Sequence, residues 1–183
     1  MRLLTVAAIF VLLLSGSVCH AQDKAAFTQL LRSETAATRL ISDLQAYDAK
    51  SPWSTDIMWR LAQQLAIKGL SGQQISTAIT AGGEMAAALD GDDQLFASVV
   101  LTTTDLVKQE RAWLTLYELE GMGVPAFDMI AEGIGRPRGE VQKLARAGRL
   151  KSSSVFELLT AFYAIKYKGM SEKLANKRRV RDQ

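Results

Sequence analysis

The sequence predicts an all-α fold: a single compact bundle of about eight or nine short helices behind an N-terminal signal-like segment. Through most of the chain, apolar residues recur every three or four positions, which is the spacing of a helix with one buried face. No stretch alternates between apolar and polar residues as a half-buried strand does. With 183 residues, of which 48% are hydrophobic and 22% charged, the chain can form one domain with a sizeable core.

Four helices are predicted in the first half of the chain, over residues 33–49, 54–67, 71–89 and 93–108. The chain breaks at Pro52, because a proline pushes the preceding residue out of the helical region. Gly69 provides a left-handed stop for the second helix, and Ser71 with Gln74 forms a capping box that starts the third. The acidic turn at residues 90–93 is expected to cap the fourth helix and not to bind calcium, since it lacks the spacing of a calcium loop.

Five more helices are predicted in the second half, over residues 113–122, 126–134, 138–147, 152–167 and 171–179. Gly123 ends the first of them, and Pro125 opens the next at a position where its missing N–H has no effect. Gly135, Gly148 and Gly169 are expected to end the following three. The last helix is highly charged, and we expect it to fray.

Two adjacent glycines, Gly82 and Gly83, fall inside the third predicted helix. Each costs about 1 kcal/mol relative to alanine in a helix interior, so their presence requires a reason. Either the helix bends at this point or another backbone packs closely against it. Together with Ala86 they would form a small-residue face, which we take as a candidate contact for packing or for a partner protein.

The N-terminus has the layout of a bacterial secretory signal peptide. A positive start at Arg2 precedes an apolar run over residues 3–14, and small residues then lead to a plausible cleavage site after Ala21. Residues 1–21 are therefore predicted to be a signal peptide, which would place the protein in the periplasm or outside the cell. The alternative is an uncleaved apolar helix, with the protein in the host cytoplasm or in a virion tail. Membrane contact is expected only through this leader.

Enzymatic chemistry has little support in the sequence. The chain's single cysteine and single histidine, Cys19 and His20, both lie in the leader, so a mature chain would lack thiol and imidazole groups. No glycine-rich phosphate loop, nucleophile elbow or metal-ligand cluster is present. We therefore expect a non-enzymatic protein with no catalytic residues, no metal site, no cofactor and no small-molecule substrate.

Positive charge is concentrated at the C-terminus. Residues 165–183 contain seven Lys/Arg and two acids and so carry +5, whereas the other residues sum to −2. We expect the domain to cover residues 22–176 and residues 177–183 to form a basic tail. This tail would be a solvated end of the chain or a contact for phosphate groups or an acidic partner.

The stretch at residues 123–150 admits a DNA-binding interpretation. Ala131, Gly135 and Val141 supply the small residue, turn glycine and β-branched anchor that a helix-turn-helix requires. The residues placed to contact bases or phosphates would be Arg138, Gln142 and Lys143. The slight negative charge outside the C-terminal segment argues against nucleic acid as a partner, so DNA binding stays an alternative.

Several segments, taken in order from Phe27, resemble the N-terminal domain of phage tail tape measure proteins. These are AFTQLLRSETAATRLISDLQAY, then Ser-Pro-Trp where the family usually has Thr-Pro-Phe, then LAQQLAIKGLSGQQISTAITAGGEMAAALDG, and finally ELEGMGVPAFDMIAEGIGRPRGEVQKLARAGRLKSSSVFELL. The resemblance implies a helical protein of the tail that acts through contacts with other tail components or with itself, with no catalytic residues to transfer.

Two departures from that family affect the expected role. Tape measure proteins continue into a long helical ruler, and this chain stops where the ruler would begin, so we do not expect it to set a tail length alone. It could be a tail-assembly domain or a prophage-derived remnant. The signal-like leader leaves a further alternative, an exported helical module that binds cell-envelope material.

Overall fold

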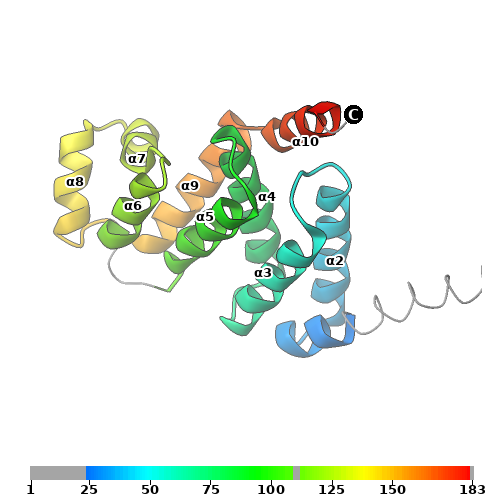
Figure 1. Cartoon of the computed structure of the whole chain (residues 1–183). Coiled ribbons are helices and arrows are strands. Elements are labelled where there is room, and N and C mark those ends of the chain that lie inside the picture. Colours follow the sequence, from blue (N-terminus) through cyan, green and yellow to red (C-terminus); the bar gives the residue numbers. More distant parts are fainter. Residues whose placement is uncertain (1–23, 109–111, 182–183) are drawn as a thin grey trace, which may run out of the picture.

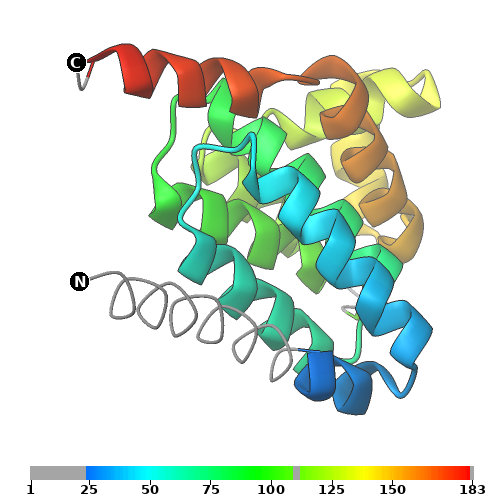
Figure 2. The same cartoon turned by 90° about the vertical axis from the view of Figure 1, so that its right-hand side faces the viewer.

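The computed structural model describes residues 24–108 and 112–181, and this part of the chain is helical without strands (Figures 1 and 2). A helical segment at residues 24–31 precedes nine bounded helices. These are α2 (Glu34–Asp48), α3 (Thr55–Ile67), α4 (Gly72–Ala88), α5 (Asp93–Asp105), α6 (Ala112–Gly121), α7 (Ala126–Ile134), α8 (Arg138–Arg146), α9 (Ser152–Lys166) and α10 (Met170–Arg181). The predicted all-α fold is confirmed. The predicted signal peptide, residues 1–21, lies outside the described residues.

Side-chain caps fix several of the helix starts. The predicted capping box at α4 is present: the Ser71 hydroxyl accepts the Gln74 N–H, and the Gln74 side chain accepts the Ser71 N–H at 2.9 Å. The Asp92 carboxylate accepts the Leu95 N–H at 2.9 Å and so caps α5. The acidic turn therefore serves as a helix entry, as the sequence indicates.

Helix α4 lies at the centre of the bundle and contacts α2, α3, α5, α9 and α10 (Figures 1 and 2). Helices α6, α7 and α8 form a second group, which meets the first through α5 and α9. Five neighbours can surround α4 because much of its surface consists of small buried residues, so the surrounding helices approach its backbone closely.

The glycine pair in α4 is one such close approach. A Cβ atom on Gly82 would lie 2.8 Å from the Val100 side chain, and one on Gly83 would lie 2.1 Å from the Tyr47 hydroxyl oxygen. The predicted close packing is confirmed. Of the two roles predicted for Gly82, Gly83 and Ala86, the structure favours packing over contact with a partner protein, because all three are buried within the chain, Gly82 against α5 and Gly83 against α2.

A buried polar cluster joins α10 to the centre of the bundle. The Tyr47 and Ser171 hydroxyls are hydrogen-bonded at 2.7 Å, and the Trp53 indole N–H donates to the Tyr47 oxygen at 3.2 Å. The Glu84 carboxylate accepts the backbone N–H of Met170 at 2.7 Å, at the positive end of α10. Burial raises the pKa of Tyr47 above its ordinary value, so this hydroxyl stays protonated.

The far end of α10 is held by Arg178. Its guanidinium donates to the backbone oxygen of Gly91 at 2.6 Å and to that of Pro52 at 3.4 Å. The same group lies 5.7 Å from the centroid of the Trp53 ring, which in turn stacks on Phe96 at 4.7 Å. One arginine thus ties the last turns of α10 to two loops and to the aromatic core.

The prediction that residues 177–183 form a basic tail separate from the domain is therefore wrong for residues 177–181, the part of this segment that the structure describes. Up to that residue the segment continues α10, which packs on the domain, and Lys177 pairs with Asp90 at 2.8 Å. This ion pair holds the pKa of Asp90 below its ordinary value. The residues that α10 contacts, such as Asp90 and Trp53, are far away in the sequence. The composition of residues 177–181 therefore does not indicate that they pack on the domain.

Replacing Arg178 with alanine should lower the free energy of unfolding by about 1 kcal/mol, because it removes a charge-assisted hydrogen bond and a cation–π contact at a partly exposed site. Arg179→Ala is the matched control. Arg179 is exposed on the same helix, and its loss should change stability by less than about 0.5 kcal/mol. Urea unfolding followed by circular dichroism measures both. Equal effects of the two variants would contradict the docking of α10 through Arg178.

None of the helices in the described part of the chain has the length and hydropathy needed to span a membrane.

Candidate protein-contact surface

The helix–glycine–helix corner predicted from the sequence is formed by α7 and α8. Pro125 precedes the first residue of α7, and Gly135 ends the helix in the left-handed conformation with φ of 65°. Pro137 then leads directly into α8, which begins at Arg138. The local signals at residues 123–150 therefore act as the sequence predicts. The contacts of the charged side chains decide what the corner can do.

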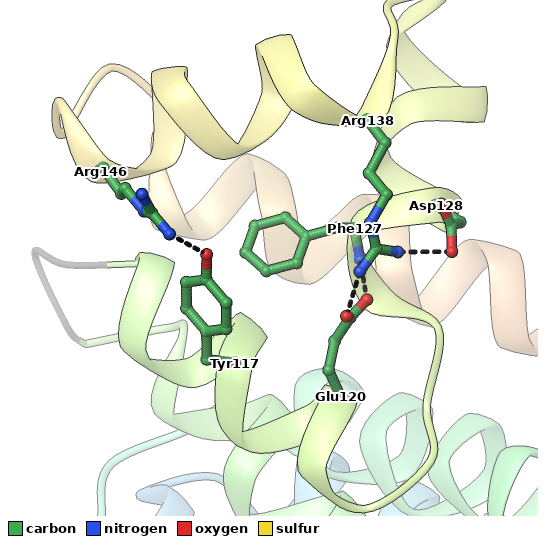
Figure 3. A network of polar contacts seen from close by, with 6 residues as sticks. All are labelled: Tyr117, Glu120, Phe127, Asp128, Arg138 and Arg146. Atoms are coloured by element: carbon green, nitrogen blue, oxygen red, sulfur yellow. Dashed lines mark hydrogen bonds and ion pairs between the residues drawn. The ribbon is translucent and has the colours of Figure 1, made fainter.

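Arg138 locks this corner to α6 (Figure 3). Its guanidinium forms ion pairs with Glu120 on α6 and with Asp128 on α7, the latter at 2.5 Å. It also lies 5.6 Å from the centroid of the Phe127 ring, and Glu120 additionally accepts the Phe127 N–H at 3.0 Å. The two carboxylates hold the pKa of Arg138 above its ordinary value. The side chain thus joins three helices.

A second arginine clamps the other end of α8. Arg146 donates to the Tyr117 hydroxyl at 2.5 Å and lies 5.6 Å from the centroid of that ring (Figure 3). Tyr117 meets Phe127 edge to face at 4.9 Å. The corner is consequently a packed unit with side-chain contacts at both ends of α8.

The residues predicted to contact DNA do not form a common exposed set. Arg138 is committed to Glu120 and Asp128, and Gln142 is half-buried. Lys143 is the one of the three predicted residues that is exposed. The contacts of Arg138 favour packing over DNA recognition, because a side chain with two acidic partners would have to give them up before it reached a base or a phosphate.

An uncovered apolar surface lies next to this corner, where α7 flanks α9. It surrounds a groove of roughly 430 Å³. The groove is lined by Glu132, Gly133, Leu158, Ala161, Phe162, Ile165 and Lys166. We call its four apolar α9 residues, Leu158, Ala161, Phe162 and Ile165, the α9 stripe. Ile165 has 79% of its surface exposed, the highest fraction among the large apolar side chains in the described part of the chain, and it differs from Ile67 and Val180 in bordering an apolar groove.

The α9 stripe follows the helical period. Ala161, Phe162 and Ile165 come three, four and seven positions after Leu158, so the four residues lie along one side of the helix. The opposite side of α9 is buried against α4, α5 and α7. It consists of Val155, Phe156, Leu159 and Tyr163, with Thr160 among them. Helix α9 is therefore apolar on two sides: the fold buries one of them and covers the other only in part, at Leu158 and Phe162.

Gly133 shapes the floor of the groove. A Cβ atom at this position would lie 2.7 Å from Leu158, so the absence of a side chain lets Leu158 rest on the α7 backbone. Ile134 follows on the same helix and is 39% exposed. The apolar surface thus extends from the α9 stripe onto the end of α7.

One exposed ion pair borders the groove. The Lys166 amine lies 3.4 Å from the Glu132 carboxylate and 4.9 Å from the centroid of the Phe162 ring. Both charged side chains are more than half exposed, so their attraction is weak and a partner could replace it.

Sequence reasoning did not identify this surface. The apolar residues between Val155 and Ile165 predict a helix, but their periodicity cannot tell which apolar side the other helices will cover. One feature of the sequence does point to an uncovered surface: residues 155–165 contain more large apolar side chains than a helix with one buried face requires.

No group of three His, Cys, Asp or Glu side chains within residues 24–108 and 112–181 is placed to hold a metal ion. Comparison of the chain with protein-family models, with curated proteins and with solved structures finds no match.

Proposed function

We propose that this chain is a non-enzymatic assembly protein of a phage tail, and that it acts through protein–protein contacts made by the α9 stripe and the adjoining end of α7. The observation that carries the proposal is the exposure of the stripe, above all of Ile165. Apolar surface that borders a groove and has a polar rim is typical of protein interaction sites.

The position of this surface adds support. It adjoins the α7–α8 corner, which lies in the segment that most resembles the N-terminal domain of tape measure proteins, residues 118–159, and the stripe begins within that segment at Leu158. The contacts of Arg138 and Arg146 join α8 to α6 and α7, so the end of α7 that borders the surface is already packed before a partner binds. A preformed surface of this kind suits assembly of a large particle.

The test is recovery of the protein in purified tails. The tagged full chain would be produced in a bacterium in which tail particles assemble, and the particles would be purified and examined by mass spectrometry. We expect the chain in the particles with Met1 or its immediate neighbour as the first residue. Ile165→Glu should reduce its incorporation at least tenfold. Val180→Glu is the matched control, because Val180 is 74% exposed on a different helix.

The leader pattern gives the second candidate its support. A chain that begins at Gln22, is found in the periplasm and is absent from particles would contradict the tail proposal. It would favour an exported module that binds cell-envelope material, which a pull-down with purified cell wall would then test.

A further inference from the structure

We infer that α10 is a releasable latch: it detaches from α4 as a unit while the other helices stay folded, and its release uncovers Tyr47 and Trp53. The latch is independent of the α9 stripe and of any role in a tail. Helix α10, drawn in red, lies along one edge of the bundle and packs on α4 (Figures 1 and 2). Gly169 precedes it in the left-handed conformation, with φ of 81°, so the turn that joins α10 to α9 contains the residue with the least restricted backbone.

Little apolar surface holds α10 in place. Three of its twelve residues are buried, namely Ser171, Leu174 and Ala175. By contrast, eleven of the seventeen residues of α4 are buried. Because the favourable free energy of packing grows with the apolar area removed from water, one leucine and one alanine contribute far less than the buried side of α4 does. A terminal helix with few buried apolar contacts opens more readily than the core of the same domain.

Charged groups at both ends of α10 supply the rest of its attachment. The Glu84 carboxylate accepts the N–H groups of Met170 and Ser171, at 2.7 and 3.3 Å, and so lies at the positive end of the α10 dipole. The Arg178 guanidinium donates to the Gly91 oxygen at 2.6 Å, just past the negative end of α4. Each end of the latch is therefore a contact between a charged side chain and a helix terminus.

These attachments are sensitive to dissolved salt. Lys177 and Asp90, which pair at 2.8 Å, have 63% and 65% of their side-chain surface exposed, so ions in solution screen their attraction. The contacts between charges and helix termini weaken in the same way. The apolar contacts that hold the other helices together do not depend on charge. Raising the ionic strength should therefore favour release of α10 over unfolding of the whole domain.

Release of α10 uncovers an aromatic surface. Tyr47 and Trp53 are only 3% and 4% exposed in the closed structure. Helix α10 contacts both of them: the Ser171 hydroxyl is hydrogen-bonded to that of Tyr47 at 2.7 Å, and the Arg178 guanidinium lies 5.7 Å from the centroid of the Trp53 ring. Without α10, water reaches the Tyr47 hydroxyl and the Trp53 indole N–H that donates to it. The latch thus controls access to a surface that the closed structure hides.

Residue-resolved hydrogen exchange of the full chain, measured by NMR, tests the latch. In about 0.05 M NaCl, the amides of residues 174–178 and the Trp53 indole N–H should share one opening equilibrium. They should exchange at least a hundredfold faster than the buried amides of α4. In about 0.5 M NaCl these groups should exchange at least threefold faster than at the lower concentration, whereas the α4 amides should change by less than twofold.

Three variants make the test specific. Glu84→Gln and Arg178→Ala remove a charge from opposite ends of the latch. Each should accelerate exchange throughout residues 174–178 about fivefold and reduce the effect of salt, because the helix opens as a unit. Arg179→Ala is the matched control: Arg179 is exposed on the same helix, so the rates should change by less than twofold.

The same measurement contains the outcomes that contradict the latch. Exchange that is fast only in the last turn of α10, α10 amides as slow as those of α4, or rates indifferent to both salt and Arg178→Ala would each overturn the inference. A Trp53 indole N–H that stays as protected as the α4 amides while α10 opens would overturn the claim that release uncovers the aromatic surface.

Discussion

Replacement of Gly83 with leucine is expected to lower the free energy of unfolding by at least about 3 kcal/mol, the largest effect of any single change proposed for this protein. Even the first added carbon would lie 2.1 Å from the Tyr47 hydroxyl oxygen and 2.8 Å from the Trp53 indole nitrogen. Tyr47 would have to move, and its buried hydrogen bond with Ser171 would be lost with it. The gain in helix propensity, about 1 kcal/mol, is smaller than these losses.

Two further variants make this result specific. Gly83→Ala adds a single methyl group and should still destabilise, by about 1–2 kcal/mol, even if the leucine variant does not fold at all. Gly139→Ala lies within α8, where a Cβ would meet no atom within 4 Å, and should stabilise by up to about 1 kcal/mol. Urea unfolding of all three measures the difference. Stabilisation by Gly83→Ala would show that α4 does not pack against Tyr47 as described.

Replacement of Arg138 with glutamate is expected to cost about 3 kcal/mol of stability, because three favourable contacts disappear and a third carboxylate is placed beside two others. The ion pairs of Arg138 are partly exposed, so each contributes modestly, and the repulsion from Glu120 and Asp128 supplies the rest. The melting temperature, followed by circular dichroism, should fall, while the helical content at low temperature should stay that of the wild-type chain.

Lys143→Glu is the matched control for Arg138→Glu. Lys143 is exposed on the same helix, so the same change of charge should alter stability by less than about 0.5 kcal/mol. The pair also separates packing from DNA binding. If α8 reads DNA, both variants should weaken salt-dependent duplex binding and Arg138→Glu should leave the melting temperature unchanged. That outcome would contradict the role of Arg138 as a clamp.

The helices and their ends could be predicted because their causes are local. The Ser71–Gln74 box and the left-handed Gly135 each act within about one helical turn, so the residues that decide them are adjacent in the sequence. The largest difference is at α5, which ends at Asp105, three residues before the predicted Lys108; α10 continues two residues beyond its predicted end, to Arg181. The acidic turn at residues 90–93 was also interpretable, since a cap requires a carboxylate beside the first N–H groups of a helix.

The roles of particular side chains could not be predicted in the same way. The sequence around Arg138 is compatible with a DNA contact, but in the structure Arg138 pairs with Glu120, eighteen positions away. Arg178 resembled part of a solvated tail, yet it rests on Trp53, which lies in the first third of the chain. Both arginines have partners that the fold brings together, and nothing in their own neighbourhood identifies those partners.

By itself the sequence determined the all-α class, most helix boundaries to within a residue or two, and the need for close packing at Gly82 and Gly83. The tertiary structure alone decided which surfaces stay uncovered. Gly83 is buried beneath Tyr47, whereas Ile165 is 79% exposed. Backbone hydrogen bonds and caps act over a few residues, so the sequence states them directly. Burial depends on which helices pack together, and that choice minimises the exposed apolar area of the whole chain.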